Sequence, residues 1–250
     1  MEFCDGASRQ SHLPDMVVNS GMRLGNSIIT ARFLKRPNRF TVLASCHGKM
    51  LRCYLPNPGR LDELLIPKAL LALNHVPSPQ RRTKFDVVAI RTGKVWVSVD
   101  SRIPNKLVGE ALRYGWLSEF RSYPEVKSEY IFGDSRIDFL LTSGRGKCLL
   151  EVKSCTLVKD GAAFFPDAPT DRGRRHVLAL VRARRKGLRA SVMFVIQRSD
   201  ATSFTPNHVT DPAFVDALRY AGQRGVEIIA RRCAVQNFQI FLGPKVAVRV

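Results

Sequence analysis

Short apolar runs separated by turn residues make up most of residues 24–100. They alternate apolar and polar positions and predict six β-strands, at 28–34, 40–45, 50–55, 70–75, 85–91 and 95–100. His47-Gly48-Lys49 and Thr92-Gly93 have the composition of hairpin turns. Because hairpins join antiparallel neighbours, we predict a small OB-like β-barrel, with a generic β domain that has no binding role as the alternative.

The hydrophobic period changes at the end of this region. Residues 101–104 (Ser-Arg-Ile-Pro) interrupt the strand pattern, and apolar residues after Asn105 recur at helical spacing, with Leu107, Ala111 and Leu112 on one side. We place a domain boundary here, with the OB-like barrel over residues 22–102 and a second domain over residues 103–250.

The second domain alternates strands and helices. Three strands are predicted in quick succession at 125–132, 136–141 and 147–152, followed by a loop over 154–171. A helix at 172–186, a strand at 190–196, a helix at 212–223 and a strand at 226–230 complete the pattern. Short αβ connections favour parallel pairing, so this domain is predicted to be α/β with a mixed sheet, and the whole chain α+β.

Residues 1–21 have no hydrophobic periodicity and are predicted to form a loose N-terminal extension, with Met16 or Met22 as alternative start sites. They lack the charged start and apolar stretch of a secretory signal, so we expect a cytoplasmic protein. The six cysteines form no pair with zinc-site spacing and are predicted to be reduced thiols.

The charge of the chain indicates its partner. Forty Lys and Arg residues against 21 Asp and Glu give a formal net charge of +19, which attracts polyanions. Apolar runs are too short for a membrane span, and no basic amphipathic stretch favours a membrane surface, so nucleic acid is the predicted partner. The oligomeric state is left open, a dimer included.

One segment concentrates the basic residues. Between 172 and 189 there are eight of them and no acidic residue, namely Arg172, Arg174, Arg175, Arg182, Arg184, Arg185, Lys186 and Arg189. An ordinary exposed helix mixes charge signs, so this helix is predicted to carry a phosphate-binding face. No aromatic residues are interleaved with it, which favours duplex DNA over a single-stranded partner.

The candidate chemistry lies on two successive strands. Alternation places Glu151 and Lys153 on one face of their strand, and the preceding short hairpin can bring Asp138 beside them. Two carboxylates can hold Mg²⁺, or Mn²⁺ in its place, and a lysine can orient a water or neutralise developing charge. The alternative is an alternating strand with a solvated charged face. Leu149 and Leu150, apolar on both faces, argue against it.

The sequence pattern defines the remaining residues of the predicted metal site less clearly. Glu110, which faces away from the apolar stripe of its helix, is our choice as third metal ligand, with Glu125 or Glu129 as alternatives. Gln197 follows the strand after the basic helix and could reach a metal-bound water or a phosphate. Each of these residues has an alternative without a role in the site: Glu110 as an exposed helix charge and Gln197 as a polar residue at the end of a strand.

Seven short motifs occur in an order that resembles the sugar fermentation stimulation protein A family. They are LPNPGR (55–60), IPNKLV (103–108), SRIDFLL (135–141), EVKS (151–154), FPDA (165–168), TxRGxxH (170–176) and FVIQR (194–198). The succession of elements with an Asp and then E-x-K also resembles the PD-(D/E)xK nuclease superfamily. The resemblance spans about residues 22–242.

This resemblance implies an OB-like domain, a nuclease-like domain, DNA binding and a link to sugar utilisation. It points to Asp138, Glu151 and Lys153 as the nuclease-like core. Arg60 could point at a phosphate and His176 could touch substrate, while Asp167 could approach the metal, although each also suits an ordinary turn, helix or loop position. Three functions are open: a Mg²⁺-dependent nuclease, a DNA-binding regulator that does not cleave, and an enzyme that acts on nucleotides or RNA.

Overall fold

The computed structural model describes residues 21–250, so the predicted loose extension lies outside the described residues apart from Gly21. The first domain is a six-stranded antiparallel sheet in the order β4-β3-β2-β5-β6-β7. Its strands are β2 (Ile28–Asn38), β3 (Thr41–Cys46), β4 (Lys49–Tyr54), β5 (Leu70–His75), β6 (Phe85–Thr92) and β7 (Val95–Ser98). Parallel pairing of β4 with β6 closes β2 to β6 into a five-stranded barrel, and β7 pairs with β6 outside this closure. The OB-like fold and all six predicted strands are confirmed.

Helix α1 (Ile103–Arg113) begins earlier than the sequence indicates. Pro104, which we took as part of a break before the helix, lies in its first turn, where no intrahelical N–H bond is lost. The short 3₁₀ helix η1 (Ser118–Phe120) follows, and its Glu119 forms a buried ion pair of 2.9 Å with Arg231.

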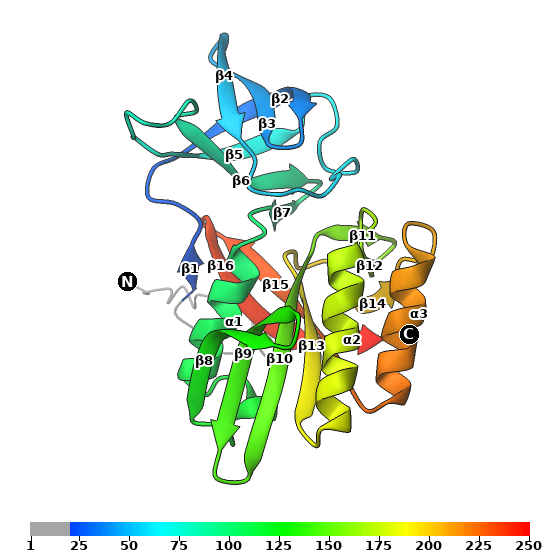
Figure 1. The fold of residues 1–250 in the computed structure, drawn as a ribbon. Helices are drawn as coiled ribbons and strands as arrows, with labels where there is room; N and C mark the ends of the chain where they lie inside the picture. Colours follow the sequence, from blue (N-terminus) through cyan, green and yellow to red (C-terminus); the bar gives the residue numbers. More distant parts are fainter. Residues whose placement is uncertain (1–20) are drawn as a thin grey trace, which may run out of the picture.

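The second domain is built on a seven-stranded mixed sheet in the order β1-β16-β15-β13-β10-β9-β8 (Figure 1). The strands are β1 (Met22–Arg23), β8 (Glu125–Phe132), β9 (Ser135–Ser143), β10 (Gly146–Cys155), β13 (Arg189–Ile196), β15 (Glu227–Gln236) and β16 (Gln239–Lys245). β10, β13 and β15 run parallel, as the short connections predicted.

Several features of this domain differ from the sequence prediction. Met22–Arg23, which we counted with the barrel, pairs with β16 and extends the C-terminal sheet. The predicted loop 154–171 contains β11 (Leu157–Lys159) and β12 (Ala162–Phe165), which form a small separate sheet with β14 (Ser203–Pro206) and β17 (Ala247–Val248). These strands are too short to show a hydrophobic period.

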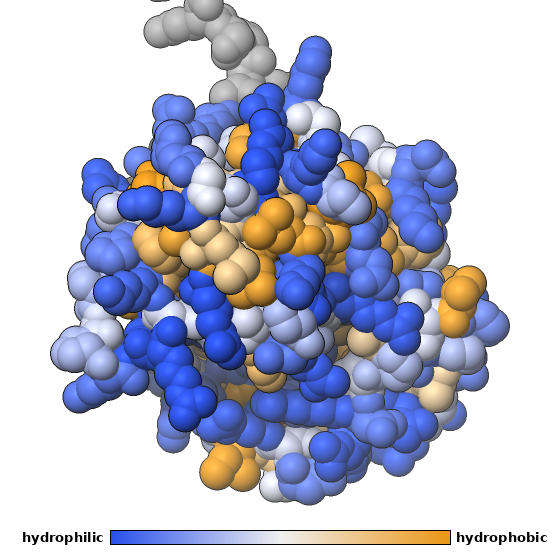
Figure 2. Space-filling model, turned by 90° about the horizontal axis from the view of Figure 1, so that it is seen from above, coloured by the Kyte–Doolittle hydropathy of each residue, from blue (hydrophilic) through white to orange (hydrophobic). Residues whose placement is uncertain are grey.

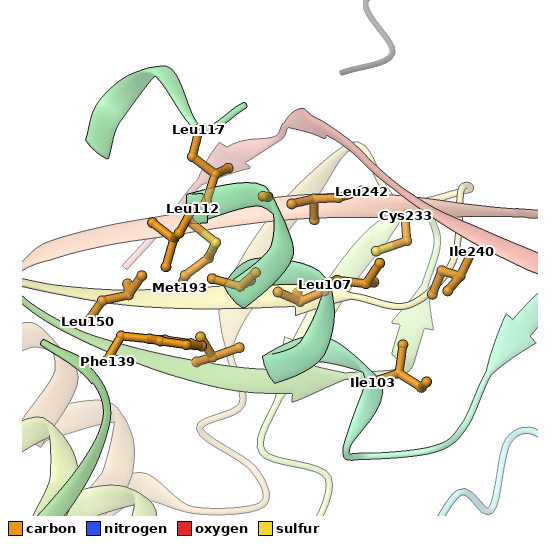
Figure 3. Close-up of a cluster of buried hydrophobic side chains, with 14 of the residues drawn as sticks. Ile103, Leu107, Leu112, Leu117, Phe139, Leu150, Met193, Cys233, Ile240 and Leu242 are labelled. Atoms are coloured by element: carbon orange, nitrogen blue, oxygen red, sulfur yellow. The ribbon is translucent and has the colours of Figure 1, made fainter. Parts of the chain in front are cut away.

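Helices cover both faces of the large sheet. Alternate residues of β10 face opposite cores, since Cys148, Leu150 and Val152 pack with α1 while Leu149 packs with α2 (Asp171–Arg185) and α3 (Pro212–Gln223). Figure 3 shows the first of these cores, in which Leu107 and Leu112 of α1 lie over strand residues of the sheet. A third core fills the barrel. The burial of β10 on both faces fixes the position of the charged residues at its end.

The two domains are joined by hydrogen bonds through buried residues. The backbone N–H of Ser98 donates to the carbonyl of Gln197 at 3.0 Å, and the hydroxyl of Ser98 donates to Gln197 Oε1 at 2.9 Å. At the opposite end of the barrel, Figure 2 shows apolar residues gathered in the middle of a largely hydrophilic face. None of the helices among residues 21–250 is long and apolar enough to cross a membrane.

Candidate metal and phosphate site

Asp138 and Glu151 lie opposite each other where β9 and β10 separate. The paired residues end at Phe139 and Leu150, and continuing the same register places Asp138 across from Glu151. There the ladder is replaced by a side-chain bond, in which the backbone N–H of Val152 donates to Asp138 Oδ2 at 2.7 Å. Asn105 of α1 donates to Asp138 Oδ1 at 2.6 Å. The predicted convergence of Asp138, Glu151 and Lys153 is therefore present in the structure.

Glu151 is buried and asymmetrically bonded. Lys153 Nζ and His176 Nδ1 each lie 2.5 Å from the same atom, Glu151 Oε1. Glu151 Oε2 is buried and has no hydrogen-bond partner. A buried carboxylate oxygen without a donor is costly unless a cation or proton meets it, so this atom fits a metal ligand.

The two carboxylates differ in their protonation. Burial, followed by the charge of Glu151, raises the pKa of Asp138 to about 6, although hydrogen bonds from Val152 and Asn105 oppose the rise. Burial also acts to raise the pKa of Glu151, but the charge of Lys153 and the bond from His176 outweigh it and hold that pKa below its ordinary value. As the pH falls, Asp138 therefore takes up a proton before Glu151 does.

Among residues 21–250, the structure does not place a third acidic side chain together with Asp138 and Glu151. Glu110 lines a hollow of about 710 Å³ together with Asp138 and Glu129. Yet residues 21–250 contain no group of three His, Cys, Asp or Glu side chains placed to hold a metal ion. Glu125, the other alternative, pairs with Thr142, towards the far end of β9 from Asp138. Glu110 as third ligand stays a prediction.

Gln197 has a structural role in this arrangement. Its side chain is fully buried, accepts from Ser98 Oγ at 2.9 Å and donates to Ser154 Oγ at 3.0 Å. Neither bond involves Asp138, Glu151 or Lys153, so its predicted catalytic role has no contact to support it here.

The basic helix divides into residues with different environments. Arg174 pairs with Asp171, Arg182 pairs with Asp134, and Arg185 donates to the hydroxyl of Tyr220 on α3. Arg172 and Arg175 instead line a hollow beside His176. The basic face predicted from the sequence is thus divided into arginines bonded to neighbouring side chains and the exposed pair Arg172 and Arg175, which have no carboxylate partner within residues 21–250.

Arg60 and Asp167 meet at the domain interface. Backbone N–H groups of Arg60 and Leu61 donate to the Asp167 carboxylate, and burial raises the pKa of that carboxyl. Arg60 lines a hollow with Asp167 and two further carboxylates, Asp62 and Glu63. These contacts belong to the barrel loop rather than to Asp138 or Glu151, so a phosphate contact for Arg60 and a metal contact for Asp167 remain predictions.

Two residues of the site were given no role from the sequence. Asn105 lies within the IPNKLV motif, but its position in the sequence does not predict that α1 packs where it can bond to Asp138 on β9. Arg136 has a clearer signal, because it stands two residues before Asp138 on one strand and lines the hollow beside His176.

Comparisons with known proteins agree with this architecture. The family model described as "Sugar fermentation stimulation protein RE domain" matches residues 102–239, and the "SfsA N-terminal OB domain" matches residues 34–99. The "Sugar fermentation stimulation protein homolog" of Moorella thermoacetica is 45% identical over 233 residues, covering 92% of this chain and 100% of its own.

The homolog of Chloroflexus aurantiacus is 46% identical over 224 residues, covering 90% of this chain and 86% of its own. The structure of Pyrococcus furiosus SfsA in complex with Ca²⁺ superimposes with a TM-score of 0.83 at 27% identity, covering 92% of this chain and 100% of that one. The OB and restriction-endonuclease-like domains imply nucleic-acid binding in general. The chain therefore belongs to the sugar fermentation stimulation protein A (SfsA) family.

Proposed function

We propose that this chain is a metal-dependent phosphodiesterase that acts on DNA. The observation that carries the proposal is the Asp138–Glu151 pair, aligned across two separating strands, with Glu151 Oε2 buried and without a donor. A protein that only binds DNA has no need for two carboxylates in its basic site, because they repel the phosphates. The pair is explained if a cation joins it.

The residues present fit a hard divalent cation. Asp138 and Glu151 would hold it through oxygen, which Mg²⁺ prefers and Mn²⁺ accepts, with water completing the coordination. Once bound, the ion would act as a Lewis acid on a phosphate oxygen and lower the pKa of a coordinated water. The Ca²⁺ complex of the Pyrococcus furiosus relative supports a divalent ion in this family.

The chain's own residues prepare this site. Asn105 and the Val152 N–H fix both oxygens of Asp138, and His176 holds Glu151 from the α2 side. Lys153 Nζ lies at the same carboxylate and can donate to an attacking water or to the charge that develops on the phosphate. The basic residues of α2 supply contacts to the DNA backbone that are independent of sequence.

One observation favours the second candidate, a DNA-binding regulator of sugar utilisation that does not cleave. The side chains of Glu151 and Lys153 are only 3% and 12% exposed, and they are paired with each other. In this arrangement Lys153 is already bonded to Glu151 before any substrate binds. A binding protein on a nuclease scaffold would keep the same fold and basic helix.

The deciding experiment compares the wild-type protein with Lys153→Ala and Asp138→Asn. Cleavage of duplex, nicked, flapped and single-stranded DNA and of RNA is measured with Mg²⁺ or Mn²⁺, and binding is measured with and without metal. Metal-dependent cleavage lost in both variants, with binding retained, supports the nuclease and ranks its substrates. Tight, salt-sensitive binding without cleavage of any substrate would leave the regulator and remove the catalytic roles.

A further inference from the structure

A separate hollow of about 310 Å³ lies beside His176, between the turn that joins β8 to β9 and the first turns of α2. The residues that line it are Asp134, Ser135, Arg136, Arg172, Arg175 and His176. Three guanidinium groups from two different elements thus meet at one depression. Arg136 comes from the same strand as Asp138, so the hollow borders the carboxylate site.

The positive charge of the hollow is poorly neutralised by the protein. Its only carboxylate, Asp134, is already paired with Arg182, which lies outside the lining. Arg136 has one acidic neighbour, Glu129 at 3.7 Å, and both side chains are more than half exposed, so that pair contributes little. Within residues 21–250, Arg172 and Arg175 have no ion pair with any carboxylate. The hollow therefore keeps an excess of positive charge, which would attract an anion.

His176 connects this hollow to the carboxylate site. Its Nδ1 lies 2.5 Å from Glu151 Oε1, while its Nε2 lies 3.5 Å from Arg172 Nε, among the residues that line the hollow. The ring is only 9% exposed, so it is held in this orientation from both sides. A ligand in the hollow would therefore be separated from Glu151 by one imidazole ring.

We propose that this hollow binds one phosphate group of a nucleic acid, next to the carboxylate site. The proposal rests on the proposed function, because it supplies the grip that would hold a DNA strand beside Asp138 and Glu151. Guanidinium groups bind phosphate oxygens in pairs of parallel hydrogen bonds, so three arginines at one depression suit a phosphate group. The phosphate is either a terminal monoester or an internal diester, which have the same recognition chemistry.

The test uses full-length protein without metal, so that it does not depend on cleavage. Arg136→Gln and Arg175→Gln are compared with Arg219→Gln, which removes an equal charge from the exposed surface of α3. The first measurement is the Tm shift produced by inorganic phosphate against chloride at equal ionic strength. The second is the affinity for short oligonucleotides with a 5′-phosphate, a 3′-phosphate or only hydroxyl ends. All variants are checked by circular dichroism.

We expect phosphate to raise the Tm of the wild-type protein and of Arg219→Gln, and to raise it less in the two hollow variants. Oligonucleotide affinity should fall about tenfold in Arg175→Gln, beyond any loss in Arg219→Gln. A preference for phosphorylated ends that is lost in Arg175→Gln identifies a terminal phosphate, and an equal loss for all oligonucleotides identifies an internal one.

Equal Tm shifts and equal affinity losses in all three variants would overturn the proposal. The Tm shift and the oligonucleotide affinity are also measured in Lys153→Ala, a variant of the carboxylate site. Failure of the phosphate site can then be told apart from failure of the proposed function. If phosphate binding in the hollow persists while the wild-type protein fails to cleave any substrate, the nuclease proposal fails and the phosphate site stands.

Discussion

The backbone N–H of Val152 donates to Asp138 Oδ2 at 2.7 Å, at the point where β10 leaves β9 and pairs only with β13. A ladder bond between backbones is replaced here by a bond to a carboxylate. The two strands thereby separate without leaving the Val152 N–H unpaired. Asp138 is the residue that takes part in this exchange, and the effect of its ionisation on stability can be measured directly.

Asp138→Asn is expected to stabilise the metal-free protein at pH 7. The carboxyl has an ordinary pKa of 3.8 and a raised pKa of about 6 in the folded state. The folded protein therefore binds the proton more tightly, and the contribution of Asp138 to stability falls as pH rises from about 4 to 6, by roughly 3 kcal/mol. Asparagine has no charge to bury, so it avoids this loss.

The measurement is urea unfolding of wild type and Asp138→Asn at pH 4 and pH 7. The variant should gain on the order of 1–3 kcal/mol relative to wild type at pH 7 and little at pH 4. A variant that is destabilised equally at both pH values would show that the Asp138 carboxylate contributes to stability through its hydrogen bonds instead.

His176→Ala is expected to weaken Mn²⁺ binding by about 10- to 100-fold, because partners that orient a ligand affect metal affinity to this extent. The reason is the 2.5 Å contact that fixes Glu151 Oε1. His176→Asn keeps a donor at the same side of the residue and should recover part of the affinity. Isothermal titration calorimetry measures the effect, with exposed His208→Ala as control. Unchanged affinity in His176→Ala would remove His176 from the metal site.

Gln197→Ala is expected to lower the free energy of unfolding by about 2–3 kcal/mol, because it leaves the buried Ser98 and the Ser154 hydroxyl without their partner. Gln223→Ala, at the exposed end of α3, should have little effect. Chemical denaturation measures both. If Gln197→Ala instead abolished cleavage at unchanged stability, the catalytic role predicted from the sequence would be correct.

Gly59→Ala is expected to destabilise the domain interface. A Cβ at this position would lie 2.3 Å from Asp167 Oδ2, and its neighbours are already held by the bond from Gly59 N–H to Asn57 Oδ1 at 2.8 Å. Overpacking of this kind costs about 1–3 kcal/mol. Gly144→Ala is the matched control, because nothing lies within 4 Å of its Cβ position. Equal Tm values for the two variants would show that the Asp167 loop moves freely.

The sequence by itself determined both domains and the central pair of the site. Alternation predicted the six strands of the first domain, and the order of strands and helices predicted the mixed sheet, because these patterns are set by which face of each element is buried. Asp138 and Glu151 were predictable as neighbours because a short hairpin fixes the register between β9 and β10.

Only the tertiary structure decided what those residues touch. His176 reaches Glu151 across 25 positions, Asn105 reaches Asp138 across 33, and Gln197 turns away from the site to bind Ser98 across 99. The division of the basic helix into paired arginines and the Arg172–Arg175 pair likewise depends on where the β8–β9 turn and α3 come to lie. Hydrophobic periodicity records the buried face of each element, whereas these polar contacts depend on how elements distant in the chain pack against one another.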